Sequence, residues 1–434
     1  MKKILGLLLL MSSVVFAREL TLDEAIDLSL KNSKKIEISS RNTKIGELNL
    51  ARAFKTALPT VMYKASYART EHTQEHTKLY ERDTPFNKPG IQPLKAEKDA
   101  YTSQFVVSQP IFQGGAILGG IRGAKAKSNI MDLSFLKEKR DTRLKTIQIF
   151  SNITKFQKDL EALETSRKSL EIRYNEQKNK LEMRLIIKAD LLKTEVALLE
   201  VESSIIQVKN AITVEMKKLR IETGISSNED IEIVDFTVPR NLSKSIDIDT
   251  DMEIAKNDSL AALIAKNNVE YAKAERMVAV SDNLPKVNAF VQYGGRYERN
   301  NIEDTFHNEE WRGGVSLTWE FFNFGSGIDE FRAANEGVKI EELNNNLTKD
   351  DIEIAITTAY SEVLRFEKLR AAMKSSVEAS EKNFEMDTER YKAGLISTQD
   401  FLNSEAQYRN SKVKYNKAES DYLLSFEKYR SLLI

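Results

Sequence analysis

The chain has 434 residues, of which 65 are basic and 65 acidic, so its formal net charge at neutral pH is zero. This balance argues against the basic field with which nucleic-acid-binding proteins attract phosphate. Cysteine is absent, which excludes disulfide bonds and a lipid anchor built on an N-terminal cysteine. Charged residues make up 30% of the chain and aromatic residues 8%, a composition that favours long helices or coiled coils.

The first 17 residues have the pattern of a secretory signal peptide. Two lysines precede an apolar run over 4–10, and the segment ends on the small residue Ala17. The run is shorter than the roughly 20 apolar residues that a transmembrane helix needs. We therefore expect residues 1–17 to be removed on export and Arg18 to begin the mature chain, with a buried N-terminal helix as the alternative.

The remaining chain contains an internal repeat. The pair Leu58-Pro59 recurs as Leu284-Pro285, Phe112 recurs as Phe322, and Asp190 recurs as Asp400. The phenylalanine pair and the aspartate pair have the same spacing, and this spacing is shorter than that of the Leu-Pro pair. The loop between the proline and the phenylalanine is therefore longer in the first half than in the second. We expect a first repeat over 18–222, a polar connector over 223–247 and a second repeat over 248–434.

Each repeat contains a long helical stretch. No proline falls in 116–222 or 326–434, and proline is poorly tolerated inside a helix. Apolar residues recur every seven positions, a spacing typical of coiled coils: Leu191, Leu198, Ile205, Ile212 and Leu219. A single helix over 116–183 would be about 100 Å long, which suits a rod or the wall of a tunnel.

Between the helices the apolar period changes from about 3.5 residues to 2. Four strands are expected, at about 60–70, 100–112, 286–298 and 310–322, with polar loops over 71–99 and 299–309. In the last strand Trp311, Val315 and Leu317 alternate with polar residues or glycine. Such segments are typical of membrane barrel strands, although a soluble sheet with one wet face is the alternative. Four strands cannot close a barrel in lipid, whereas three copies would supply twelve.

The whole mature chain resembles the TolC family of outer-membrane efflux channels. The similar segments are the opening LTLDEAIDLSLKNS, the strand-to-helix junctions QPIFQGG and WEFFNFG, and the stretch YKAGLISTQDFLNSEAQY. The resemblance implies an α+β fold and a homotrimer. Its twelve-stranded membrane barrel would continue into a long α-helical coiled-coil barrel in the periplasm, encircled by an equatorial belt that includes 223–247.

The resemblance also implies a gate at the periplasmic tip. Asp400 matches the first of two aspartates that ring the constriction, and Asn403 stands in place of the second, which would weaken cation selectivity. Asp190 matches a carboxylate that accepts a bond from an aromatic hydroxyl, here Tyr391, in the closed state. From the residues alone, solvated carboxylates at helix ends are the better interpretation of Asp190 and Asp400, because charged residues are usually exposed.

The tips of the helical hairpins are the expected docking surface for a periplasmic adaptor, or membrane fusion protein, coupled to an inner-membrane pump. The residues in question are Leu185, Gly394 and Leu395. Two positions depart from the family pattern: Arg184 stands where glycine is usual, and Ile396 replaces a basic residue of the gate. Both departures imply a rearranged closing network.

No catalytic, cofactor-binding or metal-binding site is expected. His72 and His76 are four residues apart but lack the glutamate of a metalloprotease motif, so a solvated loop is the better interpretation. The leading hypothesis is a passive channel of a tripartite efflux or type I secretion system, embedded in outer-membrane lipid. The alternative is a periplasmic coiled-coil scaffold or adaptor with a small β domain.

Overall fold

The computed structural model describes residues 18–76, 92–236, 238–239, 241–300 and 306–433. The expected signal peptide at 1–17 lies outside these residues. The described part of the chain is α+β, as expected, with helices forming most of it and one principal sheet.

Apart from β1, the two halves have the same order of elements and nearly the same helix lengths. The first half comprises β1 (Arg18–Leu20), α1 (Leu22–Asn32), α2 (Lys34–Lys55), β2 (Thr60–His76), β3 (Gln92–Gln113), α3 (Ala116–Glu182) and α4 (Lys188–Thr223). The second comprises α5 (Ile248–Asp258), α6 (Leu260–Ser281), β5 (Lys286–Asn300), β6 (Phe306–Thr318), α7 (Ser326–Lys392) and α8 (Thr398–Leu432). Both α3 and α7 have 67 residues, and both α2 and α6 have 22.

The chain divides into two compact units, and each unit takes segments from both halves. One unit consists of the described parts of Met1–Lys44, Ile130–Lys266 and Asn344–Ile434, and is helical apart from a short two-stranded sheet. The other consists of the described parts of Ile45–Asn129 and Asn267–Leu343, and contains the principal sheet with the helix ends next to it.

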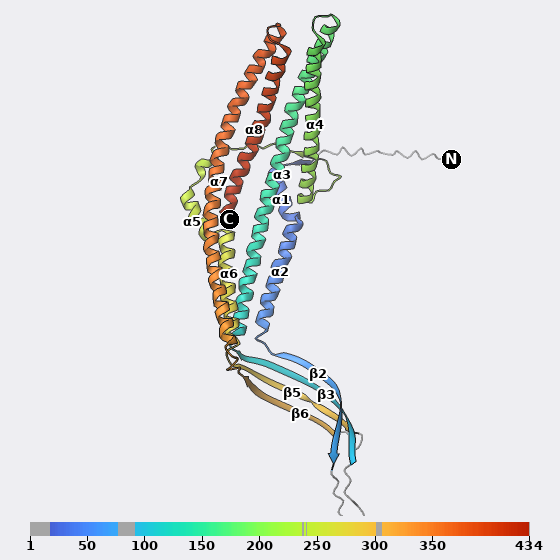
Figure 1. Cartoon of the computed structure of the whole chain (residues 1–434), viewed down its shortest axis with the longest axis vertical. Helices are drawn as coiled ribbons and strands as arrows, with labels where there is room; N and C mark the ends of the chain where they lie inside the picture. Colours follow the sequence, from blue (N-terminus) through green and yellow to red (C-terminus); the bar gives the residue numbers. More distant parts are fainter. Residues whose placement is uncertain (1–17, 77–91, 237, 240, 301–305, 434) are drawn as a thin grey trace, which may run out of the picture. The chain divides into compact units, whose positions relative to one another are not determined.

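The principal sheet is antiparallel, with the order β2-β3-β5-β6 (Figure 1). All four predicted strands are present, but their bounds differ from the expectation. Pairing continues to His76 in β2 and begins at Gln92 in β3, so the loop expected over 71–99 is shorter. The backbone ladder requires no apolar side chains, which explains why it outlasts the alternating pattern. In contrast, β6 ends at Thr318 rather than near 322.

In the helical unit the α3–α4 hairpin and the α7–α8 hairpin lie side by side (Figure 1). Apolar residues from α3, α4 and α8 share one buried cluster: Leu163, Leu170, Val201, Ile205, Phe401 and Leu402. The aromatic positions spaced seven apart in α8 contribute the fully buried Phe401, Tyr422 and Tyr429. The heptad pattern therefore marks a packing seam, as its spacing predicts.

The connector between the halves pairs with the start of the chain. Gly224 ends α4 in the left-handed conformation, a common way to end a helix. Beyond it, β4 (Ile231–Ile233) runs parallel to β1, and a short 3-10 helix, η1, covers Leu242–Ser245. The segment from β4 to η1 packs against helices from both halves, in part through Phe236 and Leu242.

Candidate functional site

The principal sheet gathers most of its apolar residues on one face. The cross-strand register aligns Val61 with Val107, Val107 with Val291, Val287 with Leu317 and Ala289 with Val315. Most positions on the opposite face are polar residues or glycine, as in the pairs Lys64–Gln104 and Asn288–Ser316, although Met62, Val106 and Phe290 also lie on it. Since successive side chains in a strand point to opposite faces, this register gives the sheet one continuous apolar face.

A row of aromatic side chains crosses this apolar face. Tyr63, Phe105, Tyr293 and Trp311 are aligned on the four successive strands. The ring centroids of Tyr63 and Phe105 are 5.0 Å apart, and those of Tyr293 and Trp311 are 4.7 Å apart. Tyr63, Phe105 and Trp311 are largely exposed in the single chain, and Tyr293 is 36% exposed. An exposed apolar face crossed by an aromatic row is typical of a surface that meets lipid.

The two helical hairpins turn in the same way at their tips. The amide of Leu185 donates to the carbonyl of Lys180 and the amide of Arg184 to that of Leu181. The same two bonds recur at the tip of the second hairpin, from Leu395 and Gly394. This pattern is the Schellman motif, which requires a left-handed residue after the helix. Arg184 takes that place with φ 61° and Gly394 with φ 74°.

Leu185, Gly394 and Leu395, predicted as a docking surface, lie at these turns and are exposed. The arginine at 184 adopts the conformation that favours glycine, so the departure noted in the sequence is accommodated by backbone strain. The structure therefore keeps the turn geometry and changes only the residue that occupies it.

Asp400 lies in the first turn of α8 and takes part in the cap of that helix. Its Oδ2 atom accepts hydrogen bonds from the amide of Ser397 (3.2 Å) and from the Ser397 hydroxyl (2.7 Å). In return the amide of Asp400 donates to the Ser397 hydroxyl at 3.1 Å, completing a capping box. The bonds from Ser397 hold the pKa of the Asp400 carboxyl below its ordinary value. Asn403 lies one turn further along, also exposed, and accepts a bond from Gln399 at 3.0 Å.

The expected bond between Asp190 and Tyr391 is not formed within the chain. Asp190 is paired with Lys193, on the next turn of its own helix, at 3.4 Å. The Tyr391 hydroxyl instead accepts a bond from the Gln177 amide at 2.7 Å and is 3.2 Å from the Thr398 hydroxyl. Tyr391 does join the two hairpins, but its partner is a residue of α3 rather than the carboxylate at the start of α4.

A buried cluster around Arg173 was not anticipated from the sequence. The Arg173 guanidinium lies 4.8 Å from the Tyr391 ring and 4.9 Å from the Phe401 ring, and these two rings are stacked with centroids 5.0 Å apart. One terminal nitrogen bonds to Glu176 at 2.7 Å. Among the described residues, the Nε atom of Arg173 and the Oε1 atom of Gln177 are buried without hydrogen-bond partners. The cluster joins α3 to α7 and α8 below the tips, and we call it the Arg173 cluster.

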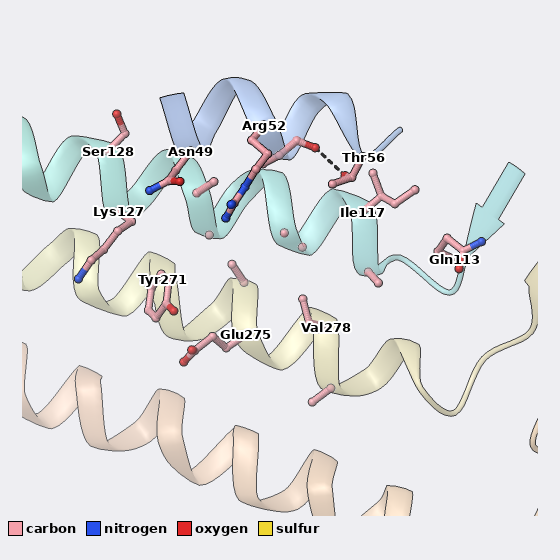
Figure 2. A pocket seen from close by; sticks show the side chains of 18 of the residues that line it. Asn49, Arg52, Thr56, Gln113, Ile117, Lys127, Ser128, Tyr271, Glu275 and Val278 are labelled. Carbon is pink, nitrogen blue, oxygen red and sulfur yellow. Dashed lines mark hydrogen bonds between the residues drawn. The ribbon is translucent and has the colours of Figure 1, made fainter. Parts of the chain in front are cut away.

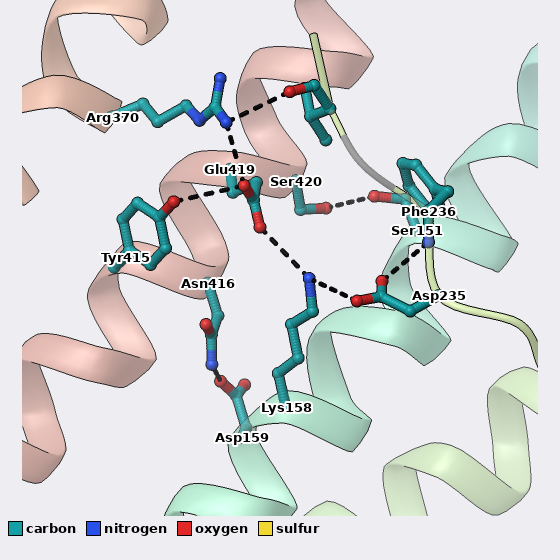
Figure 3. A network of polar contacts seen from close by, with 11 residues as sticks. Ser151, Lys158, Asp159, Asp235, Phe236, Arg370, Tyr415, Asn416, Glu419 and Ser420 are labelled. Atoms are coloured by element: carbon teal, nitrogen blue, oxygen red, sulfur yellow. Dashed lines mark hydrogen bonds and ion pairs between the residues drawn. The ribbon is translucent and has the colours of Figure 1, made fainter. Parts of the chain in front are cut away.

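A second polar cluster ties the connector to both hairpins (Figure 3). Lys158 of α3 lies 3.2 Å from Asp235 of the connector and 3.3 Å from Glu419 of α8. Arg370 of α7 lies 3.1 Å from Glu419 and donates to the carbonyl groups of Val238 and Pro239, each at 3.2 Å. Burial acts to lower the pKa of Lys158, but attraction to Glu419 and Asp235 outweighs burial and raises the pKa, which keeps Lys158 a cation. We call this the connector network.

Asp159, next to Lys158, is almost completely buried. Its carboxylate accepts a bond from Asn416 of α8 at 2.8 Å and lies 3.8 Å from Lys155. Burial raises the pKa of Asp159 despite these two contacts, because desolvation disfavours the charged form.

In the unit with the sheet, a cleft of about 890 Å³ lies between α2, α3 and α6 (Figure 2). Residues of α3 form part of its lining. Glycine at position 119 allows α3 to pack closely against α6, because a Cβ atom there would lie 2.9 Å from a methyl group of Val278. The cleft is lined mainly by apolar and small residues, with Arg52 and Lys127 opposed by Glu275 and Glu330. Its charges are therefore balanced.

The described residues contain no group of three or more side chains placed to hold a metal ion. None of the helices described in the structure has an apolar stretch of the length needed to cross a bilayer.

A sequence model of the outer membrane efflux protein family matches residues 251–433. The match covers most of the second half of the chain. The resemblance to TolC-type efflux proteins and the expected outer-membrane location are thereby confirmed. This efflux family is not a class of enzymes.

Solved structures show that the outer membrane efflux fold extends over nearly the whole chain. The Campylobacter jejuni CmeC outer membrane channel has a TM-score of 0.80 and 17% identity, covering 95% of this chain and 85% of its own. The Vibrio cholerae outer membrane protein VceC has a TM-score of 0.75 and 13% identity, covering 95% of each chain. The Neisseria gonorrhoeae MtrE outer membrane channel in its open state has a TM-score of 0.72 and 14% identity, covering 95% and 88%. No curated protein sequence matches the chain.

Proposed function

We propose that the chain is the subunit of a homotrimeric outer-membrane exit duct, a passive channel that catalyses no reaction. The observation that carries this proposal is the sheet with one apolar and one polar face, joined to two long helical hairpins. The apolar face suits lipid, and the polar face suits a water-filled interior. The match of residues 251–433 to the model of an efflux family agrees with this assignment.

The proposed trimer follows from the edges of the sheet. The outer strands are β2 and β6, and no further strand of the described chain lies beside either of them. An open strand edge cannot face lipid, because its backbone groups would lack hydrogen bonds. With four strands per chain, β6 of one copy would pair antiparallel with β2 of the next. Three copies then close a twelve-stranded barrel.

We further propose that the hairpin tips form a periplasmic gate. Three copies of Asp400 around the three-fold axis would make a ring of negative charge, with Asn403 one turn away adding hydrogen-bonding groups but no charge. The Arg173 cluster would hold the tip closed, since it joins the α3–α4 hairpin to the α7–α8 hairpin. Asp190 is near the same tip and contributes a carboxylate at the start of α4.

Opening would require a partner that separates the hairpins. The exposed residues Leu185, Gly394 and Leu395 offer such a partner a surface at the turns. We propose a periplasmic adaptor coupled to an inner-membrane pump, as in a tripartite efflux or type I secretion system. The pump would choose the cargo.

The membrane assignment is tested by a pair of variants on one strand. Val315 lies on the apolar face of β6 and Ser316 on the polar face. A lysine facing lipid near the midplane costs about 2–4 kcal/mol, whereas a lysine facing the water-filled interior costs little. We expect Val315→Lys to prevent heat-modifiable trimers from accumulating in the outer membrane and Ser316→Lys to leave them intact. Equal accumulation of both variants would instead support a soluble scaffold.

The gate assignment is tested by single-channel conductance in planar bilayers. Asp400→Asn removes the charge and keeps the shape of the side chain, whereas Ser397→Ala removes its capping partner and keeps the charge. We expect cation selectivity to fall in Asp400→Asn and to persist in Ser397→Ala. Unchanged selectivity in Asp400→Asn would keep the channel but remove Asp400 from the constriction.

A further inference from the structure

The charged side chains of the cleft between α2, α3 and α6 are separated by sign between the two halves of the chain. The cations are Arg52 of α2 and Lys127 of α3, both from the first half, and the anions are Glu275 of α6 and Glu330 of α7, both from the second. In Figure 2, Arg52 extends from α2 over α3 and Lys127 extends from α3 toward α6, which carries Glu275. The cleft therefore has positive charge on the side of α2 and α3 and negative charge on the side of α6 and α7.

These charges are not paired with one another. Among the described residues, the side chains of Arg52, Lys127 and Glu330 have no hydrogen-bond or ion-pair partner. Glu275 is engaged by Tyr271, its neighbour on α6, and this hydrogen bond raises the pKa of the Tyr271 hydroxyl. Ionised groups form the stronger class of hydrogen bond, so the cleft offers free donors to an anion on one side and carboxylates to a cation on the other.

The middle of the cleft is kept open by a glycine that packing within the chain does not require. Gly120 of α3 lines the cleft, and a Cβ atom at this position would meet open space. This differs from the neighbouring Gly119, where a Cβ atom would press on Val278. Glycine inside a helix is destabilising relative to alanine. Contacts within the chain therefore give no reason for Gly120, whereas an occupant of the cleft does.

The cleft opens on the side of the polar face of the sheet. Gln113, at the end of β3, lines the cleft and is aligned with Lys286 of β5. Its side-chain amide donates to the Oδ1 atom of Asn288, which lies on the polar face, at 2.8 Å. In the proposed duct this face borders the water-filled interior. A neighbouring copy would continue the wall beside α2 or α7 and would leave the cleft open to the interior.

We propose that the cleft is a cargo-binding site in the wall of the duct, for an aromatic molecule with an acidic group at one end and a basic group at the other. Arg52 and Lys127 would bind the acid, and Glu275 and Glu330 the base. The ring of Tyr271, 37% exposed, offers an aromatic surface to the body of the molecule. A volume of about 890 Å³ is in the range of small-molecule sites. The inference rests on the proposed function, since only a duct brings cargo to this side of the wall.

Three related compounds test the class of cargo. The zwitterion is 4′-(aminomethyl)biphenyl-4-carboxylic acid, and two analogues, biphenyl-4-carboxylic acid and 4-(aminomethyl)biphenyl, each lack one of its charges. Binding to the purified trimer in detergent is measured by isothermal titration calorimetry. We expect the zwitterion to bind about tenfold more tightly than either analogue, because each analogue loses a charged hydrogen bond. Equal binding of the three compounds would overturn the proposed class, and no binding of the zwitterion would overturn the site.

Charge-removing variants test the residues. Arg52→Gln and Glu275→Gln should each weaken binding of the zwitterion by about tenfold. Lys55→Gln is the matched control, because Lys55 is an exposed cation of α2 that does not line the cleft, and it should leave the affinity unchanged. Equal affinities in Arg52→Gln and Lys55→Gln would overturn the role of Arg52 and with it the site.

A cleft-filling variant separates cargo from a second copy as the occupant. Gly120→Leu places a side chain in the cleft, and Gly337→Leu of α7 is its control, because a Cβ atom at Gly337 also meets open space. We expect Gly120→Leu to abolish binding of the zwitterion and Gly337→Leu to preserve it, with trimers formed by both. If Gly120→Leu prevents trimer formation and Gly337→Leu does not, a neighbouring copy occupies the cleft, which overturns the proposal.

Single-channel recording in planar bilayers distinguishes failure of the site from failure of the duct. We expect the zwitterion to produce brief blocks of the current in the wild type and none in Gly120→Leu. A channel that conducts without such blocks would leave the duct in place and overturn the cargo site. If the folded trimer neither inserts nor conducts, the proposed function fails and the cargo site fails with it.

Discussion

Replacing Arg173 by methionine should weaken the contact between the two hairpins. Arg173 is 8% exposed, and its guanidinium lies 4.8 Å from the Tyr391 ring and 4.9 Å from the Phe401 ring. A cation–π contact contributes about 0.5–1 kcal/mol when exposed and about 2 kcal/mol when desolvated. Methionine keeps most of the apolar stem but loses both contacts.

Two effects reduce the size of this loss. The Nε atom is buried without a partner among the described residues, and its removal relieves a desolvation cost. The ion pair with the half-exposed Glu176 contributes little, about 0–1 kcal/mol. We therefore expect a net loss of about 1–3 kcal/mol, which shifts the equilibrium toward separated hairpins by roughly 5- to 150-fold.

Single-channel recording in planar bilayers measures this shift as the fraction of time spent in higher-conductance states. Lys178→Met is the matched control, because Lys178 is an exposed cation just over one turn from Arg173 on the same helix. An open fraction in Arg173→Met no larger than in Lys178→Met would refute the assignment of the Arg173 cluster as the closing contact.

Four further substitutions test the stability of the helical unit, each followed by thermal unfolding in detergent. Arg184→Gly should stabilise the protein by about 1 kcal/mol, because glycine adopts the left-handed conformation without strain. Gly394→Ala should destabilise the protein by a similar amount for the opposite reason. Effects of the same sign in the two variants would contradict this interpretation. Burial raises the pKa of Asp159 in the folded protein above its ordinary value of 3.8. The protonated carboxyl therefore stabilises the fold below pH 3.8, and this contribution to the free energy of unfolding is lost as the pH rises through the raised pKa. Asp159→Asn should therefore be more stable than the wild type near neutral pH, with the difference vanishing as pH falls below that ordinary pKa; a difference independent of pH would refute the assignment. Glu419→Ala should destabilise by about 2–4 kcal/mol, since it leaves Lys158 and Arg370 partly buried without their shared carboxylate, and a loss below about 1 kcal/mol would show that the connector network contributes little.

The periodic features of the sequence predicted the periodic parts of the fold. The constant spacing between the halves corresponds to the paired left-handed positions at Arg184 and Gly394 and at Gly114 and Phe324. The two-residue alternation located all four strands, because apolar side chains must share a face. It misplaced their ends, since backbone hydrogen bonds continue past the last apolar residue in β2 and stop before the aromatic run after β6.

The Arg173 cluster could not be inferred from any local pattern. Arg173 lies in a charged stretch of α3, in the other half of the chain from Tyr391 and Phe401, and only the packing of the two hairpins brings them together. The family resemblance implies a bond between Tyr391 and Asp190, whereas within the chain the partner of Tyr391 is Gln177. Adjacent turns of a helix hairpin present several polar residues to one ring, and the sequence does not rank them.

If the hairpins separate as proposed, the connector network would be the pivot of that motion. It joins α3, α7 and α8 at the level of Lys158, which lies about 39 Å of helix from the turn at Arg184. A rotation of about 10° between the hairpins around that level would displace the tips by about 7 Å, whereas at Arg173, about 22 Å from the pivot, the same rotation opens about 4 Å. A force applied at the tip therefore acts with almost twice the leverage of the contact that resists it.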